Sequence, residues 1–175
     1  MNTLYTIGHS NRTIEQFIDL LKAHGIQEIV DVRTVPKSKH NPQFGQDALS
    51  ASLREAGIDY IYLKKLGGFR HTTSASINTG WRNLSFRGYA DYMSTEEFQE
   101  GLQELEALAQ KKTVAILCAE AVPWRCHRSL IADALTTQGW QVLHIQSKKT
   151  AKPHTPTPFL RVQDGKLTYP AVEEV

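Results

Sequence analysis

The stretch from residue 114 to residue 132 constrains the fold more than any other part of the chain. Residues 114–117 form a continuous apolar run, Val-Ala-Ile-Leu, which predicts a strand over residues 113–117 that is buried on both faces of a parallel sheet. A polar loop follows, and after residue 126 the apolar residues recur at helical spacing. The stretch therefore predicts a strand, a loop and a helix, the repeating unit of an α/β fold.

The chain before this stretch alternates between the same two kinds of pattern. Apolar strand-like runs and amphipathic helical segments succeed one another with short connections, which is typical of a parallel sheet with helices on its faces. The strands are expected at residues 3–7, 26–32 and 58–63, and the helices between them at residues 14–24 and 47–56.

Capping and turn signals place several further boundaries. Thr13 with Gln16, and Ser94 with Glu97, have the spacing of capping boxes at helix starts. A fifth strand is expected at residues 140–145, and the Asp-Gly pair at residues 164–165 predicts a hairpin. We therefore predict an α/β three-layer sandwich with a mainly parallel five-stranded sheet, helices on both faces and a C-terminal hairpin.

Two segments depart from this alternation. Residues 64–92 form a long connection after the third strand, interrupted by glycines but containing aromatic residues, and predict an irregular, lid-like insertion over the carboxyl edge of the sheet. Residues 148–175 contain closely spaced prolines, which predict an extended tail before the hairpin. With 175 residues, the chain is expected to form one domain, residues 1–175.

Chemically reactive side chains follow three of the predicted strands. His9 follows the first strand, Arg33 the second, and Cys118 with Glu120 the fourth. If these strands are neighbours, the residues share the carboxyl edge of the sheet, where open α/β sheets bind ligands. We predict a catalytic site there, with Cys118, Glu120 and His9 as candidate nucleophile and acid–base groups. If the chain is an enzyme, a hydrolase or transferase is expected.

The helix after this loop adds cationic groups. Arg125, His127 and Arg128 stand at its predicted amino end, where free amides and the helix dipole favour anions. Together with Arg33, the two arginines suit bidentate binding of a phosphate or carboxylate. The predicted ligand is therefore an anionic small molecule or a nucleotide.

Several of these residues also have a purely structural interpretation. Cys118 suits packing at a strand end, Glu120 suits a salt bridge to a neighbouring arginine, and Asp31 with Arg33 suits an ion pair within the fold. Cys118 can act as a nucleophile only if nearby cations lower its pKa, and the carboxylate of Glu120 acts against that.

A metal or redox site at the cysteines is an alternative. Cys118, Cys126, His127 and either His9 or His154 are acceptable zinc ligands. However, the C-x7-C-H spacing matches no zinc motif. We predict no cofactor and keep a metal- or redox-responsive site as an alternative function.

The insertion offers a second alternative, a nucleic-acid interface. For a nucleotide ligand at the predicted site, Trp81 and Tyr89 are expected to stack on the base. For nucleic acid, the basic and aromatic residues that interleave in the insertion, with three lysines of the tail, are Arg70, His71, Trp81, Arg82, Arg87, Tyr89, Lys148, Lys149 and Lys152. The formal net charge of the chain is only +2, so its overall field does not favour nucleic acid. Two cysteines, the lack of a signal-peptide pattern and the lack of a long apolar run predict a cytoplasmic protein without membrane contact. The sequence predicts no oligomeric state.

Two family resemblances concern these residues. The tripeptide Asp31-Val32-Arg33 and a later strand ending in Cys118 resemble rhodanese-like domains and their phosphatase relatives. Those enzymes wrap a shorter, glycine-containing loop around their anion. Here six residues, including Glu120, separate Cys118 from Arg125, so we transfer neither a sulfurtransferase nor a phosphatase mechanism.

The sequence more closely resembles the family of domain of unknown function 488. The similar motifs lie in the same order along most of the chain: Thr6-Ile7-Gly8-His9-Ser10, Asp31-Val32-Arg33 with Pro36 and Ser38, Leu66-Gly67-Gly68, and Cys118-Ala119-Glu120 leading to Cys126-His127-Arg128. This resemblance implies a cytoplasmic α/β domain with these residues as its shared site, and it implies no particular reaction.

Overall fold

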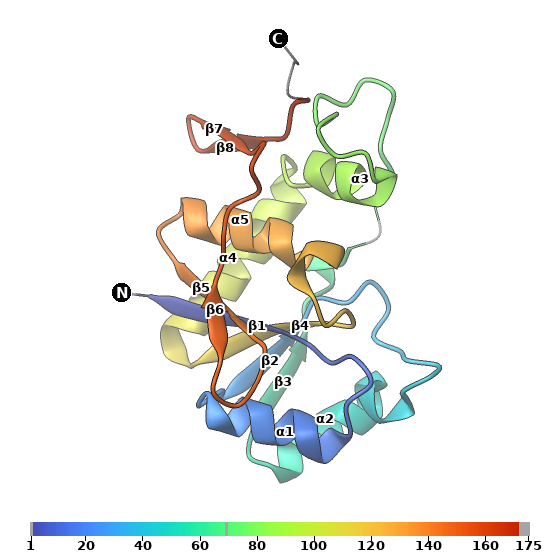
Figure 1. Cartoon of the computed structure of the whole chain (residues 1–175), viewed down its shortest axis with the longest axis vertical. Helices are drawn as coiled ribbons and strands as arrows, with labels where there is room; N and C mark the ends of the chain where they lie inside the picture. Colours follow the sequence, from blue (N-terminus) through green and yellow to red (C-terminus); the bar gives the residue numbers. More distant parts are fainter. Residues whose placement is uncertain (1, 69, 172–175) are drawn as a thin grey trace.

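The computed structural model, which describes residues 2–68 and 70–171, has the predicted three-layer α/β architecture (Figure 1). A six-stranded sheet in the order β3-β2-β4-β1-β5-β6 forms the middle layer. Neighbouring strands from β3 to β5 are parallel, and β6 is antiparallel to β5. The sheet thus has one strand more than predicted, because part of the tail pairs with its edge. The strands are β1 (Thr3–Gly8), β2 (Glu28–Asp31), β3 (Asp59–Tyr62), β4 (Val114–Cys118), β5 (Gln141–Ile145) and β6 (Ala151–Pro153).

Helices cover both faces of the sheet (Figure 1). One face packs against α1 and α2, with Phe17, Phe44 and Leu53 in the core, and the other packs against α4 and α5. Every residue of β4 is buried, which confirms the prediction of a strand covered on both faces. The helices are α1 (Ile14–Ala23), α2 (Gln46–Glu55), α3 (Leu84–Tyr92), α4 (Glu96–Lys111) and α5 (Arg128–Thr137).

One of the two predicted capping boxes is present. Thr13 accepts a hydrogen bond from the main-chain N–H of Gln16, and the Gln16 side chain accepts one from the main-chain N–H of Thr13. The prediction of a capping box at Ser94 was wrong. The hydroxyl of Thr95 caps α4 instead and accepts from the main-chain N–H of Phe98, because Ser94 lies one residue too far from the first helical turn.

The segments outside the alternating pattern are more regular than expected. The insertion at residues 64–92 begins with a 3₁₀ turn and ends in α3, so its last part is helical where the sequence predicted irregular structure. The predicted hairpin is present as β7 (Arg161–Gln163) and β8 (Lys166–Thr168). Its turn residues Asp164 and Gly165 both have positive φ, as a tight hairpin turn requires. No helix in the described residues is long and apolar enough to cross a membrane.

Candidate functional site

The three strands whose carboxyl ends were predicted to meet are neighbours. β4 lies between β1 and β2, and Cys118 at its end is opposite Gly8 at the end of β1. The main-chain N–H of His9 donates to the main-chain oxygen of Cys118 at 3.0 Å, and that of Val32 donates to Leu117 at 3.0 Å. The carboxyl ends of the first, second and fourth strands therefore lie at one edge of the sheet.

The two cysteines of the chain meet at this edge. Cys118 ends β4 and Cys126 lies two residues before α5. Their Cα atoms are 7.1 Å apart and their sulfur atoms are in direct contact. Both residues are buried, so the short loop between them folds back and places one sulfur against the other. The structure records the pair as a disulfide, and its reduction would give two adjacent buried thiols.

Arg128 is a fully buried cation beneath this loop. Its Nη1 donates to the sulfur of Cys118 at 2.8 Å and to the main-chain oxygen of Glu120, and its Nη2 donates to the main-chain oxygen of Ala121 at 3.0 Å. Burial lowers its pKa to about 10, with a smaller lowering by Arg12 and an opposing effect of Glu120. The guanidinium is thus charged at neutral pH, and its hydrogen-bond acceptors are the sulfur of Cys118 and two main-chain oxygens.

The position of Arg128 differs from the one that the sequence predicted. It contacts the main chain of Glu120, and none of its described hydrogen bonds goes to a carboxylate. Arg128 also does not line the pocket that opens onto the two cysteines. It therefore contacts Cys118 from the protein interior. Gly8 makes room for it, because a Cβ at that position would overlap the main-chain oxygen of Glu120 and lie 2.6 Å from Nη1 of Arg128.

His127 holds the start of α5 against the end of β2. Its Nε2 lies 2.8 Å from the main-chain oxygen of Val32 and 3.1 Å from that of Leu66. Both partners are acceptors, so the ring proton is on Nε2 and Nδ1 is an acceptor. Nδ1 lies 3.7 Å from the sulfur of Cys126. Burial lowers the pKa of His127 to about 4, so the ring is neutral at neutral pH.

A pocket of about 300 Å³ opens onto the two cysteines. We call it the rim pocket. Its charged lining groups are Arg33, Lys37, Arg125 and Glu120, and the last three are exposed. The full lining is Arg33, Thr34, Val35, Lys37, Gly68, Ser85, Phe86, Cys118, Ala119, Glu120, Arg125, Cys126 and His127. The structure therefore brings most of the predicted site residues together.

Lys37 is a pocket residue that the sequence analysis did not select. It lies four residues after Arg33 in the loop that leaves β2. A loop leaving the carboxyl end of a strand borders the same edge as the residues at that end, so its position was the signal. Gly68 was selected as part of a motif, and the structure supplies its reason. A Cβ at Gly68 would overlap the ring of His127.

Arg33 forms the structural ion pair that was its alternative interpretation. Its Nη2 lies 2.7 Å from Oδ2 of Asp31, its Nε donates to the same carboxylate, and its Nη1 donates to the main-chain oxygen of Phe44 at 2.6 Å. Tyr60 also donates to Asp31. The charge of Arg33 is thus neutralised within the fold, although the side chain still contributes to the pocket wall.

His9 lies at the edge but outside the rim pocket. Its ring stacks on Phe44 at a centroid distance of 4.4 Å, and its Nδ1 lies 2.8 Å from the main-chain oxygen of Ser10. Burial lowers its pKa, so the ring is neutral at neutral pH. His9 follows Gly8 and therefore faces α1 and α2, since side chains alternate across a strand. Its predicted acid–base role has no support from this position.

Neither of the two aromatic residues expected to stack on a base lines the rim pocket. Tyr89 is fully buried and donates to the main-chain oxygen of Leu66 at 3.0 Å, so the stacking prediction for Tyr89 was wrong. Trp81 packs edge-on against Phe86 and Phe159. It lines a different cavity of about 420 Å³ beside the proline-rich tail, so it does not join the rim pocket.

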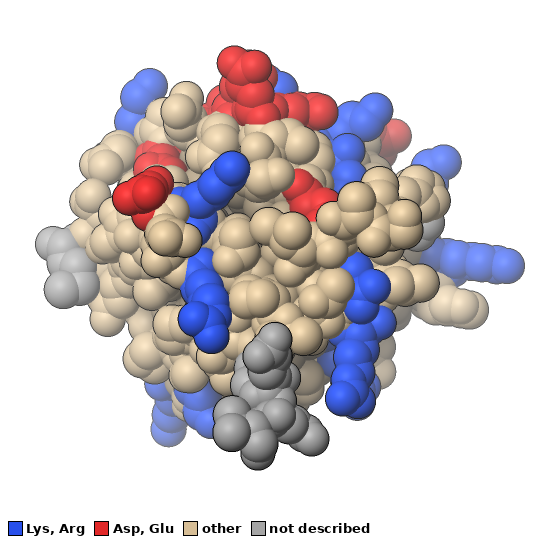
Figure 2. Space-filling view, turned by 90° about the horizontal axis from the view of Figure 1, so that it is seen from above, with Lys and Arg blue, Asp and Glu red and all other residues tan. Residues whose placement is uncertain are grey.

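The basic residues of the insertion also make contacts within the fold. The guanidinium of Arg70 lies 3.6 Å above the ring of Tyr92, and Nε of Arg87 donates to the main-chain oxygen of Trp81. On the face shown in Figure 2, Lys and Arg side chains stand in separate groups, and Asp and Glu side chains lie on the same face. Among the described basic residues of the insertion, Arg70 and Arg87 are therefore held by contacts within the fold, whereas Arg82 is exposed.

His154, a candidate zinc ligand, is engaged in the tail. Its Nε2 lies 2.7 Å from Oδ1 of Asp133 and its Nδ1 lies 2.8 Å from Nε2 of His144. In the described part of the chain, no three His, Cys, Asp or Glu residues are grouped so that they could hold a metal ion. Cys118, Cys126 and His127 are neighbours, whereas His154 is held in the tail by Asp133 and His144.

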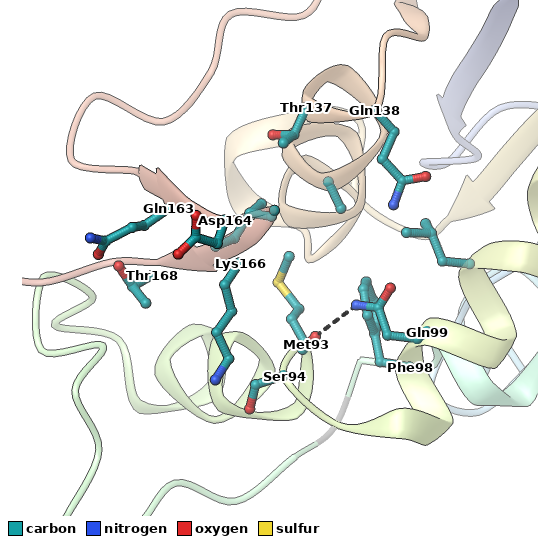
Figure 3. Close-up of a pocket in the computed structure, with 14 residues that line it drawn as sticks. Met93, Ser94, Phe98, Gln99, Thr137, Gln138, Gln163, Asp164, Lys166 and Thr168 are labelled. Carbon is teal, nitrogen blue, oxygen red and sulfur yellow. Dashed lines mark hydrogen bonds between the residues drawn. The ribbon is translucent and has the colours of Figure 1, made fainter.

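A larger cavity of about 650 Å³ lies away from this edge, between the hairpin, α5 and the start of α4 (Figure 3). Met93 and Gln99 line it and are joined by a hydrogen bond from Nε2 of Gln99 to the main-chain oxygen of Met93 at 3.2 Å. Its charged lining residues are Asp164 and Lys166. It has no cysteine, histidine or arginine in its lining, so we place the candidate site at the rim pocket.

Comparison with known proteins identifies the family. A model of the family described as Domain of unknown function DUF488 matches residues 13–135. The chain belongs to this family. The matched region of the DUF488 chain contains both cysteines, Arg128 and every lining residue of the rim pocket. No curated protein and no solved structure matches the chain, and the rhodanese-like resemblance has no counterpart in these comparisons.

Proposed function

We propose that the DUF488 chain is a cysteine-dependent enzyme that binds a small anionic molecule in the rim pocket and attacks it with the sulfur of Cys118. The observation that carries this proposal is the contact between Arg128 and Cys118. A buried cation that donates to a sulfur favours its thiolate form, and the thiolate is the nucleophilic form of cysteine. Arg128 is charged and fully buried, and donates to Cys118 at 2.8 Å.

The charge of the rim pocket supports an anionic ligand. Arg33 is balanced by Asp31, which leaves Lys37 and Arg125 as exposed cations against the single carboxylate of Glu120. A volume of about 300 Å³ suits a small molecule or part of one. Lys37 and Arg125 would hold its acidic group, and Glu120 would accept a hydrogen bond from a hydroxyl or amine.

The test measures alkylation of Cys118 in a Cys126→Ala variant, where it is the only cysteine. The rate of alkylation by iodoacetamide is expected to increase with pH. The midpoint of this increase should lie below about pH 8.5, the value for a free thiol. A midpoint at or above that value would refute the proposal that Cys118 is the nucleophile.

The same variant tests the preference for anions. We expect the ratio of the iodoacetate rate to the iodoacetamide rate to exceed that of a free small thiol, because the first reagent is an anion and the second is neutral. Arg125→Gln should lower the ratio about two- to fivefold, as expected for an exposed charge pair. Arg82→Gln, which changes an exposed arginine outside the pocket, should leave it unchanged. Equal effects of the two changes would refute anion binding by Arg125.

A further inference from the structure

We propose that Cys118 and Cys126 act as an attacking and a resolving thiol, and that the substrate of the rim pocket is a low-molecular-weight disulfide carrying carboxylate groups. This inference rests on the proposed nucleophile at Cys118 and names its substrate class. The sulfur atoms of the two cysteines are in direct contact. A second thiol in that position can displace any group bound through sulfur to the first.

The surroundings give the two sulfurs different roles. Cys118 receives the guanidinium of Arg128 and is the sulfur favoured as thiolate. The sulfur of Cys126 lies 3.7 Å from Nδ1 of His127, which is an unprotonated acceptor, and it accepts a hydrogen bond from the main-chain N–H of Arg128, with the nitrogen at 3.4 Å. Cys126 is therefore placed to keep its proton toward His127 until its sulfur is needed.

The burial of the two cysteines and the charge of the rim pocket indicate the class of substrate. Cys118 is 2% exposed and Cys126 is 6% exposed, so both sulfurs are reached through the rim pocket and a disulfide on the surface of a folded protein cannot approach them. Lys37 and Arg125 stand at the wall of that pocket, where a carboxylate on the substrate would bind. A small acidic disulfide meets both requirements.

In this thiol–disulfide exchange the substrate disulfide is itself the oxidant. The Cys118 thiolate attacks one substrate sulfur, a bond forms between these two sulfurs, the substrate S–S bond breaks, and half of the substrate leaves as a thiolate. The Cys126 sulfur then attacks Cys118, the mixed disulfide breaks, and the second half leaves as a thiol with the proton of Cys126. Two electrons pass from the cysteine pair to the substrate. A dithiol reductant returns the pair to the reduced form by the reverse exchange.

The experiment mixes the reduced, full-length chain with three small disulfides: dithiodipropionate, which carries carboxylates, hydroxyethyl disulfide, which is neutral, and cystamine, which carries ammonium groups. Each rate is divided by that of mercaptoethanol with the same disulfide. We expect the normalised rate to fall in that order. Arg125→Gln should lower the dithiodipropionate rate about two- to fivefold, and Arg82→Gln should leave it unchanged.

Intact mass identifies the roles of the two sulfurs. The wild-type chain should lose two hydrogens and carry no adduct, whereas Cys126→Ala should retain half of the disulfide on Cys118. A lasting adduct on the wild-type chain, or no preference for dithiodipropionate, would overturn this inference even if Cys118 alkylates with a low midpoint. If the alkylation rate of Cys118 instead had a midpoint at or above that of a free thiol, the proposal that Cys118 is a nucleophile would itself be wrong. The two failures are therefore distinguishable.

Discussion

Replacement of Arg128 by methionine is the most direct test of the site. In the structure the guanidinium donates to the sulfur of Cys118 and to two main-chain oxygens of the following loop. Methionine has a similar length and no charge, so Arg128→Met removes the cation without opening a large cavity. The change is made together with Cys126→Ala, so that only Cys118 reacts with a thiol reagent.

The expected effect follows from the distance between the two groups. The donor nitrogen is 2.8 Å from the sulfur, and an opposite charge at such a range shifts a titration midpoint by about 1–3 units. Each unit corresponds to about 1.36 kcal/mol, so the loss of Arg128 should weaken the thiolate by about 1.4–4 kcal/mol. Alkylation at neutral pH should then fall about tenfold or more, because a free thiol is only a few per cent ionised there.

The assay is the iodoacetamide rate as a function of pH, with the maximal rate at high pH as an internal reference. Arg128→Lys is the matched control, since it keeps a charge but loses the paired donors, and its midpoint should lie between those of the parent and Arg128→Met. Circular dichroism confirms that each variant is folded. A folded Arg128→Met chain with an unchanged midpoint would show that Arg128 does not stabilise the thiolate.

Three further predictions concern the same structure. Gly8→Ala should cost about 1–3 kcal/mol of unfolding free energy in urea, because its Cβ would overlap the loop above Arg128; an unchanged value would contradict this close approach. The pKa of His127 is lowered to about 4 from 6.5, so protonation of the unfolded chain should remove about 1–2 kcal/mol of stability between about pH 7.5 and pH 5. His9 and His144 also have lowered pKa values, so His127→Gln should make the dependence of stability on pH less steep, and an unchanged slope would contradict this prediction. Asp133 accepts hydrogen bonds from His154, Thr157 and Tyr169, so Asp133→Ala should cost about 3–5 kcal/mol and expose the tail to limited proteolysis; a protease-resistant tail would contradict this.

Local patterns in the sequence were sufficient for the fold class and for the edge that carries the site. The apolar run of β4, the capping box at Thr13 and the Asp-Gly turn all depend on neighbours within a few residues, so their structures follow from spacing alone. The edge was predictable because all parallel strands of one sheet end on the same side. The sixth strand was missed because β6 pairs with β5 through a tail that has no strand pattern of its own.

The roles of individual side chains were decided by the tertiary structure. Arg128 carries the same sequence signal as Arg125, yet one is fully buried against Cys118 and the other lines the rim pocket. Tyr89 was selected for an exposed role and is fully buried. The sequence by itself determined which reactive groups follow the carboxyl ends of strands, because the position of a strand along the chain is indicated by local patterns. Only the packing of the loop and α5 over the edge of the sheet decided which of them face solvent and which face one another, because burial depends on residues far apart in the chain.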